Sequence, residues 1–450
     1  MNGHADTALR SWWVLGALSL LQFLIAVDVT VVNVALPSIG ADFGVAPPEL
    51  TWVVVAYSVT GGGLLMLGGR LGDVLGRRRA LLAGTSLFGA ASLLAGLAPS
   101  FGVLVVARLL QGAGEALALP AAMAAIVLLF PEGPRRARAL SIWAAVASSG
   151  LVLGFVLSGV LTELLGWRSA FLVTVPFVVV VLGGVPAFLP RDRPQRREPL
   201  DLSGSVLLTA APLLFVTGVS GARGPWQVIA LAAALLAAVA FVLVERRAAH
   251  PLIPPAFFRN RIRVTANVAT ALLSAALSTS FLLLTFHLQQ RAGHDPLETG
   301  VALLPLAVTL VLAATLVPRL LGRWGFRACS LTGIALTALG MAAIAVAAGD
   351  GGTGFAILAM ILIATGMGFG LVGLQYAAVH DVSDEDAGTA SGVQRAADQL
   401  GGATGIALYT GIGFGAGAAW TDPFVTSCVL AVGGLALAAV VTGAGRAGRP

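Results

Sequence analysis

Residues 68–79 read GGRLGDVLGRRR, a segment with four glycines and four arginines. It separates two apolar windows, 49–68 and 80–97, each close to the roughly 20 residues that an α-helix needs to cross a bilayer. The same alternation of long apolar windows and short arginine-bearing segments recurs along the whole chain. It predicts an all-α protein that crosses a membrane many times.

The composition agrees with a membrane protein. Of the 450 residues, 57% are hydrophobic and 11% are charged, and the mean hydropathy is +0.92, whereas globular domains carry about 25% charged residues. All 27 basic residues are arginine. A chain without lysine has neither the lysine of an ATP-binding P-loop nor one for a Schiff base, so we expect no use of ATP.

Chemistry-bearing residues are scattered. Cys329 and Cys428 lie in or beside apolar segments, and the five histidines form no metal-ligand spacing. We therefore expect no enzyme, catalytic residue, metal or cofactor. The net charge of +6 lies in short loops, so it indicates membrane topology and not nucleic-acid binding. The N-terminus is too polar for a signal peptide, and its first apolar window is too long for one.

Fourteen windows are long and apolar enough to span a bilayer. They are 11–39, 49–68, 80–97, 101–130, 139–161, 169–189, 202–219, 227–244, 264–288, 297–318, 327–347, 354–379, 388–412 and 422–443. Removing the pair at 202–244 would leave twelve helices with a long central loop, but both windows are apolar enough to span.

The arginines predict the orientation, because cytoplasmic loops are enriched in them. With the N-terminus inside, every arginine except Arg108, Arg168, Arg223, Arg291 and Arg395 falls on the cytoplasmic side. A missed helix would invert all later loops and destroy this asymmetry. We therefore expect a multi-pass protein of the cell membrane with both termini in the cytoplasm.

A weak internal repeat indicates two related halves. The segment PRLLGRWGFRA (318–328) aligns with the opening segment when Gly325 is set on Gly76, which also pairs Arg319 with Arg70. Repeated halves around a site at mid-membrane are a feature of secondary transporters.

Three motifs resemble those of one family. GGRLGDVLGRRR is similar to the signature loop of the major facilitator superfamily, and RLLQGAGEAL (108–117) is similar to its fourth-helix motif. VDVTVVNVALP (27–37) resembles the first-helix motif of its 14-helix drug:proton antiporters, the EmrB/QacA type. Further similarity lies in GWRSAFLVTVP (166–176), ERRAAHPLIPPAFFRNR (245–261) and SGVQRAADQLGGATGIAL (391–408).

The resemblance implies a fold, a domain organisation and a function. The major facilitator fold would comprise a six-helix bundle at 1–189, two additional helices with cytoplasmic linkers at 190–263, and a second six-helix bundle at 264–450. The activity would be proton-coupled export of lipophilic, cationic drugs or toxic compounds by alternating access. The partners would be a small-molecule substrate, protons and the bilayer, and the protein would be a monomer.

The chain departs from the antiporter pattern at several positions. Phe155 stands where helix 5 of the antiporters has proline, and Ser158 replaces the first of two glycines. Arg395 stands where an asparagine is usual, and Asp398 stands where a basic residue is usual. Arg395 and Asp398 are also spaced to pair along their own helix.

Two predicted helices carry charges at bilayer depth. Asp28 lies roughly 24 Å along the helix that begins near Trp12, and Arg108 lies about 10 Å into the helix that begins near Phe101. Because these helices run in opposite directions, both charges reach a similar depth. Glu115 lies on the same stripe as Arg108, one or two turns deeper.

A charge at bilayer depth costs roughly 2.5–3.5 kcal/mol, so we expect these side chains to line a cavity. Our hypothesis makes Asp28 a proton and cation site, Arg108 its modulator and Glu115 a second acidic contact. The alternative is a permanent ion pair that holds the two helices together. Other expected cavity residues are Asn33, Gln111, Trp52, Tyr57, Tyr376 and Asp398.

The opening segment has a different expected role. Asp73 is placed to cap a helix, while Arg77 and Arg78 would pair with acids or lipid headgroups. By resemblance, Gly69, Asp73, Gly76, Arg77 and Arg78 form a cytoplasmic latch that holds one access state. The acidic run 381–386 is a possible partner for these arginines.

Other functions stay open. Within transporters, the alternative is an exporter of a neutral or anionic endogenous metabolite, antibiotic or lipid. A membrane scaffold or sensor is the non-transport alternative, and it predicts no proton-coupled acid in the cavity.

Overall fold

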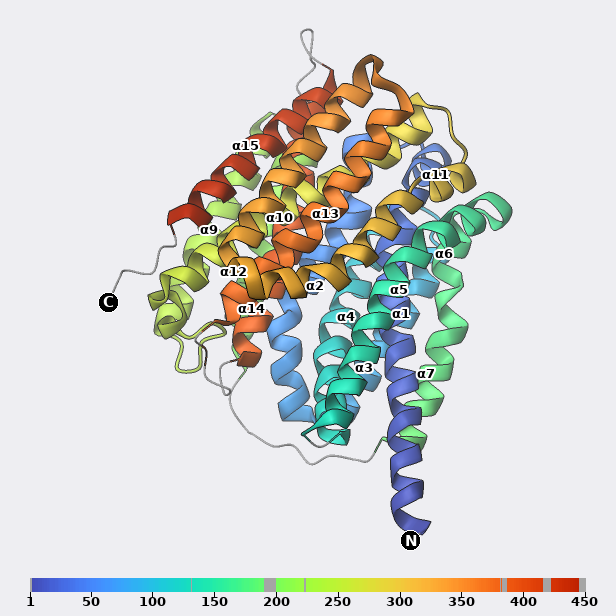
Figure 1. Ribbon diagram of the computed structural model, residues 1–450, viewed down its shortest axis with the longest axis vertical. Coiled ribbons are helices and arrows are strands. Elements are labelled where there is room, and N and C mark those ends of the chain that lie inside the picture. Colours follow the sequence, from blue (N-terminus) through green and yellow to red (C-terminus); the bar gives the residue numbers. More distant parts are fainter. Residues whose placement is uncertain are drawn as a thin grey trace.

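The computed structural model describes residues 2–130, 132–189, 200–221, 224–380, 382, 387–415 and 422–444 of the chain. Long helices arranged side by side make up nearly all of it, and no strand occurs in these ranges (Figure 1). The N-terminal half consists of α1 (Asn2–Phe43), α2 (Pro47–Leu75), α3 (Arg77–Gly96), α4 (Phe101–Leu129), α5 (Pro134–Leu165), α6 (Arg168–Leu172) and α7 (Thr174–Phe188).

Two further helices and the C-terminal half follow. They are α8 (Leu202–Val216) with η1 (Thr217–Gly221), α9 (Pro225–Arg247), η2 (Pro255–Arg259), α10 (Arg261–Phe286) with η3 (His287–Arg291), α11 (Pro296–Ala302), α12 (Leu304–Val346) with η4 (Ala347–Gly351), α13 (Gly352–Val379), α14 (Ala387–Gly415) and α15 (Pro423–Ala444).

These elements confirm the fourteen predicted spans. The helix α12 contains two of them, because its backbone breaks at Gly325, and the short α6 and α11 each complete a longer span. Within the described ranges, thirteen helices are long and apolar enough to cross a membrane. The more polar α14, with Arg395 and Asp398, supplies the fourteenth.

The internal repeat is visible in the backbone. Gly76 joins α2 to α3 with φ 90° and ψ 138°, and Gly325 breaks α12 with φ 75° and ψ 161°. Residues with a Cβ rarely adopt a positive φ. The two glycines that align in the sequence therefore make the same kind of turn at equivalent places in the two halves.

Each half packs mainly within itself. In the first half α4 contacts α2 and α3, and α1 contacts α5 and α7; in the second, α12 contacts α13, and α10 contacts α14 and α15. The helices α8 and α9 pack on each other, and α8 and η1 contact α2 and α14 at the side of the molecule. The predicted domain boundaries at 189 and 263 stay a prediction, and residues 190–199, with four of the predicted cytoplasmic arginines, lie outside the described residues.

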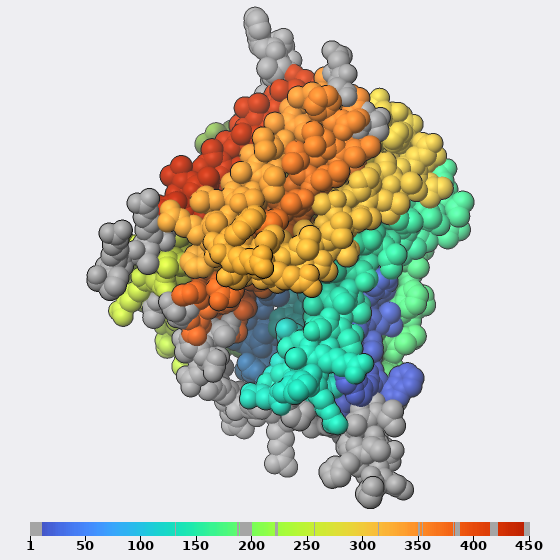
Figure 2. Space-filling model, in the orientation of Figure 1, coloured from blue at the N-terminus to red at the C-terminus, as the bar shows by residue number. Residues whose placement is uncertain are grey.

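The two halves meet along α2 and α14 and at one end of α5. At the end of the molecule far from the N-terminus, Gly159 of α5 packs on Leu297 of α11, and Gln289 donates a hydrogen bond to the Val34 carbonyl at 2.9 Å. Toward the end that holds the N-terminus the halves separate, and Figure 2 shows the surface hollowed between α14 and α5, with α2 at depth. With the predicted topology, this opening faces the cytoplasm.

Candidate functional site

Asp28 and Arg108 form an ion pair between α1 and α4. Arg108 Nη1 lies 2.6 Å from Asp28 Oδ2, and each side chain is only 1% exposed. The sequence-based prediction that these residues lie at the same depth is therefore confirmed. Neither side chain faces the opening in this conformation.

Further hydrogen bonds surround this pair. Arg108 donates to the Val53 carbonyl at 2.8 Å and to Gln111 Oε1 at 2.9 Å. Gln111 in turn donates to Asp28 Oδ1 at 3.3 Å and to Ser92 Oγ at 2.8 Å. A buried ion pair with this many partners is held in one geometry. The arrangement favours the alternative considered for Asp28, a structural tie between α1 and α4, while its predicted role in coupling stays a prediction.

Tyr57 links this pair to a second polar cluster. Its ring lies under the Arg108 guanidinium, 4.3 Å from centroid to Cζ. Its hydroxyl approaches Glu115, but it makes no hydrogen bond. The close approach of α2 and α4 depends on Gly112, because a Cβ there would stand 2.2 Å from the Tyr57 carbonyl oxygen.

Glu115 is the buried acid at the junction of the two halves. Its side chain is 1% exposed. Gln399 of α14 donates a hydrogen bond to Glu115 Oε1 at 3.1 Å, and Arg395 Nη2 lies 3.8 Å from the same oxygen. Glu115 Oε2 has no hydrogen-bond partner. The carboxylate thus connects α4 of one half to α14 of the other.

The expected pairing of Arg395 with Asp398 is wrong. Arg395 points to Glu115, whereas Asp398 accepts a hydrogen bond from Ser274 of α10. The two side chains leave α14 toward different neighbouring helices, so their spacing in sequence does not bring them together. Sequence analysis missed Gln399, although the unusual residues Arg395 and Asp398 pointed to this part of α14.

The remaining predicted cavity residues are dispersed. Asn33 donates to the Val29 carbonyl of its own helix at 2.8 Å, and Trp52 is half-buried against the apolar core. Tyr376 is 50% exposed near the end of α13, where its ring contacts Phe326 and His380. The structure therefore brings Gln111 and Tyr57 to the buried polar clusters, but it does not bring Tyr376 there.

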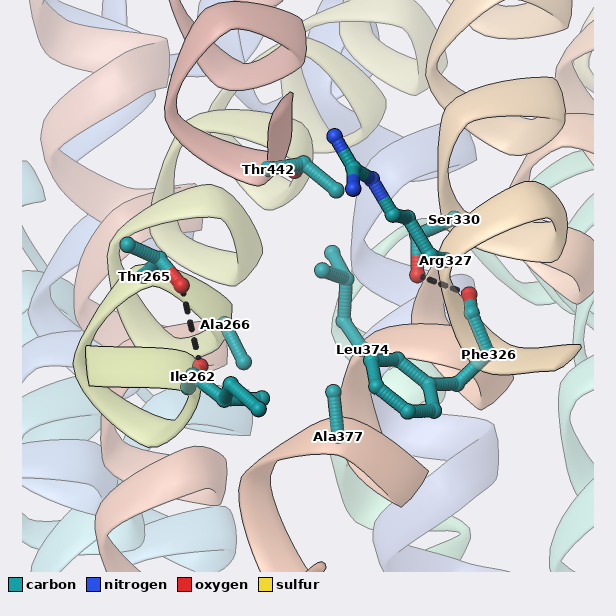
Figure 3. A pocket seen from close by; sticks show the side chains of 9 residues that line it. All are labelled: Ile262, Thr265, Ala266, Phe326, Arg327, Ser330, Leu374, Ala377 and Thr442. Carbon is teal, nitrogen blue, oxygen red and sulfur yellow. Dashed lines mark hydrogen bonds between the residues drawn. The ribbon is translucent and has the colours of Figure 1, made fainter. Parts of the chain in front are cut away.

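A small cleft lies in the same region as Tyr376. Figure 3 shows it between the start of α10, the part of α12 that follows the break at Gly325, and the ends of α13 and α15, with the Arg327 side chain at its edge. Arg327 donates to the Gly443 carbonyl at 2.6 Å. The lining residues are Ile262, Thr265, Ala266, Phe326, Arg327, Ser330, Leu374, Ala377 and Thr442. None of them belongs to the Asp28 or Glu115 cluster.

Two departures from the antiporter motif have contacts of their own. The Phe155 ring lies 6.2 Å from the Phe281 ring, so it connects α5 to α10 of the other half. Ser158 Oγ donates to the Val31 carbonyl at 2.6 Å and ties α5 to α1. Phe155 therefore packs across the two halves, whereas Ser158 joins two helices of the same half.

The residues of the expected latch make contacts that differ in part from those predicted. Asp73 does not cap a helix: it lies in the last turn of α2, and the N-cap of α3 is Gly76, without a side-chain hydrogen bond. Asp73 instead lies 3.9 Å from Arg77. Arg78 donates to the Leu189 and Pro186 carbonyls and so fixes the end of α7.

Other parts of the latch prediction have different outcomes. A Cβ at Gly69 would fit, in ordinary van der Waals contact with Pro120 at 3.8 Å, so close packing does not require a glycine there. Arg70 donates to the His250 and Pro251 carbonyls in the segment after α9. The acidic run 381–386 lies outside the described residues, apart from Val382, and the role of the latch in holding an access state stays a prediction.

Fourteen membrane helices in two repeated halves, with buried charges inside the bundle, are the architecture of a membrane transporter. A model of the Major Facilitator Superfamily matches residues 18–406, and the chain belongs to this family. It is 51% identical over 447 residues to the lincomycin resistance protein of Streptomyces lincolnensis, a match that covers 97% of this chain and 92% of that protein.

Other relatives agree. The puromycin resistance protein pur8 of Streptomyces alboniger is 38% identical over 94% of this chain and 86% of its own length. A crystal structure of a POT family transporter in complex with 5-aminolevulinic acid has a TM-score of 0.75 over 96% of both chains. At 14% identity, that likeness shows the fold alone.

Proposed function

We propose that this protein exports small-molecule drugs or antibiotics from the cell in exchange for protons. Its relatives include proteins named for lincomycin resistance, puromycin resistance and cephamycin export. We place it in the cell membrane as a monomer with both termini in the cytoplasm, without an enzymatic activity. The proton gradient would supply the energy in place of ATP, at about 2.3 kcal/mol per charge per 100 mV and about 1.4 kcal/mol per pH unit.

The position of Glu115 is the observation that carries the proposal. A carboxylate at this depth is stable only with compensating partners, and Glu115 has one unpaired oxygen and a cation no closer than 3.8 Å. Uptake of a proton would remove the charge that attracts α4 to Arg395 of α14. Because these helices belong to opposite halves, proton binding and the relative position of the halves would be linked.

Everted membrane vesicles test this proposal. A pH gradient should drive a lipophilic cationic dye into vesicles that contain the wild-type protein, and Glu115→Gln should abolish this gradient-dependent movement. Glu132→Gln is the matched control, because Glu132 is exposed and pairs with Arg136 in the first turn of α5, away from both buried acids. Asp28→Asn should also lose gradient-dependent movement if Asp28 couples protons to transport, and should keep it if Asp28 only ties α1 to α4. Gradient-dependent movement at the wild-type rate in Glu115→Gln would contradict the proposal.

Export of a neutral or anionic compound is the second candidate. The half-exposed guanidinium of Arg395 favours it, since a free face of an arginine can bind a carboxylate or phosphate. Transport of an anionic dye that is lost in Arg395→Gln and kept in Glu115→Gln would select this candidate. A scaffold or sensor would move none of these dyes.

A further inference from the structure

We propose that Arg395 is a tethered counter-cation of Glu115, and that a protonated amine of the cargo takes its place. This inference rests on the proposed export function and names the chemical class of cargo that the site prefers. It makes Arg395 a residue that determines specificity, through its competition with the cargo for one buried carboxylate.

The geometry of Arg395 fits a cation that can be displaced. Its guanidinium approaches Glu115 to 3.8 Å, without a hydrogen bond to any residue in the described part of the chain, and its side chain is 49% exposed. Arg108, by contrast, lies 2.6 Å from Asp28, is 1% exposed and donates to two further acceptors. The two buried acids therefore differ: Asp28 belongs to a fixed ion pair, and Glu115 belongs to a loose pair whose arginine borders solvent.

Among the described residues, the cluster around Glu115 keeps two oxygens without a hydrogen bond, although the Tyr57 hydroxyl approaches the carboxylate. Glu115 Oε2 and Gln399 Oε1 have no hydrogen-bond partner, although Glu115 is almost fully buried. Both oxygens face Gly61 of α2, at 3.2 and 3.1 Å from the position that a Cβ would occupy. A buried acceptor without a donor is costly, so a ligand with N–H groups would stabilise this arrangement.

The two oxygens without hydrogen bonds, Glu115 Oε2 and Gln399 Oε1, favour cations that carry N–H groups. A primary or secondary ammonium carries both a positive charge and N–H donors, so it can replace Arg395 and also satisfy the unpaired oxygens. A quaternary ammonium carries only the charge. We therefore expect a preference for protonated amines, which comes from hydrogen bonding at Glu115 and Gln399.

Equilibrium binding to the purified full-length protein in detergent tests the inference. The probes are a dansyl compound that ends in a primary ammonium, its trimethylammonium derivative and its neutral N-acetyl derivative. The variants are Arg395→Gln, Arg395→Lys, Glu115→Gln and the double variant Arg395→Gln/Glu115→Gln. Arg323→Gln is the control, because Arg323 is an exposed arginine on α12 outside both clusters.

Arg395→Gln removes the residue that competes with the cargo. It should strengthen binding of the primary ammonium about fivefold, as expected for a partly exposed charge pair. The trimethylammonium probe should gain less, and the neutral probe should not change. Arg395→Lys and Arg323→Gln should bind as the wild type does. In the Glu115→Gln background, Arg395→Gln should have no effect, because the two residues act through one contact.

Unchanged or weaker binding of the primary ammonium to Arg395→Gln overturns the inference, and so does an equal gain for all three probes. Absence of measurable binding in both wild type and Arg395→Gln also overturns it. The vesicle experiment is independent: gradient-driven export with an unchanged Arg395→Gln affinity removes this inference alone. Absence of gradient-driven export in the wild type removes the proposed function.

Discussion

At the scale of single residues, the two buried acids have different surroundings. Asp28 has a close arginine and a glutamine, and both partners are themselves held by further hydrogen bonds. Glu115 has a weaker set of partners from the opposite half and one unpaired oxygen. The sequence ranked Asp28 first as the coupling acid, whereas the contacts favour Glu115, because only its partners change when the halves move apart.

The fixed pair gives a residue-scale prediction. Arg108→Met would leave Asp28 buried without its cation, and losing one partner of a buried pair costs about 3–5 kcal/mol. We expect this variant to unfold at a markedly lower temperature in detergent, measured by tryptophan fluorescence or size-exclusion chromatography after heating. Arg395→Gln is the comparison, since its half-exposed side chain should contribute little to stability. An Arg108→Met protein as stable as the wild type would refute the structural role.

At the scale of elements, glycine positions decide how closely helices approach and where they break. Gly112 allows α4 to lie against α2, which brings Tyr57 under Arg108. Gly76 and Gly325 break the backbone at equivalent places in the two halves. The sequence alignment of these two glycines predicted the repeat, but only the structure shows that both have a positive φ.

The break in α12 gives an element-scale prediction. The conformation of Gly325 is one that only glycine adopts readily, so Gly325→Ala should destabilise the protein by about 1–3 kcal/mol. In the described part of the chain, no atom beyond the two neighbouring residues lies within 4 Å of the added Cβ, so the effect would come from the backbone alone. Gly322→Ala is a matched control in the same helix, because its Cβ also meets nothing and its backbone is helical. If Gly325→Ala and Gly322→Ala unfold at the same temperature, the backbone at Gly325 accepts a side chain without strain, and the prediction is wrong.

At the scale of the whole molecule, the halves are closed at one end and separate at the other (Figure 2). The closed end is built from α5, α10 and α11, and it includes the departures Phe155 and Ser158 from the antiporter motif. With the predicted topology, this arrangement corresponds to an inward-facing state.

Cysteine labelling tests topology and state together. In a background with Cys329 and Cys428 replaced by alanine, Ser141→Cys on the exposed start of α5 should react with a membrane-impermeant maleimide only in everted vesicles. Thr299→Cys is fully buried at the closed end, so it should react in neither orientation at rest. Rapid labelling of Thr299→Cys in right-side-out vesicles would mean that the resting protein faces outward.

The sequence by itself determined the fourteen spans, their expected orientation, the two-fold repeat and the family. Hydropathy and arginine distribution are properties along the chain, and a bilayer of fixed thickness converts them directly into helices and topology. The similar depth of Asp28 and Arg108 also followed, because helix direction and rise fix depth. That the two side chains meet was decided by the packing of α1 on α4. Only the tertiary structure decided that Arg395 faces Glu115 and not Asp398, and that Gln399 completes the cluster. The partner of a polar side chain depends on which neighbouring helix its face meets, and that is set by packing between helices far apart in the chain.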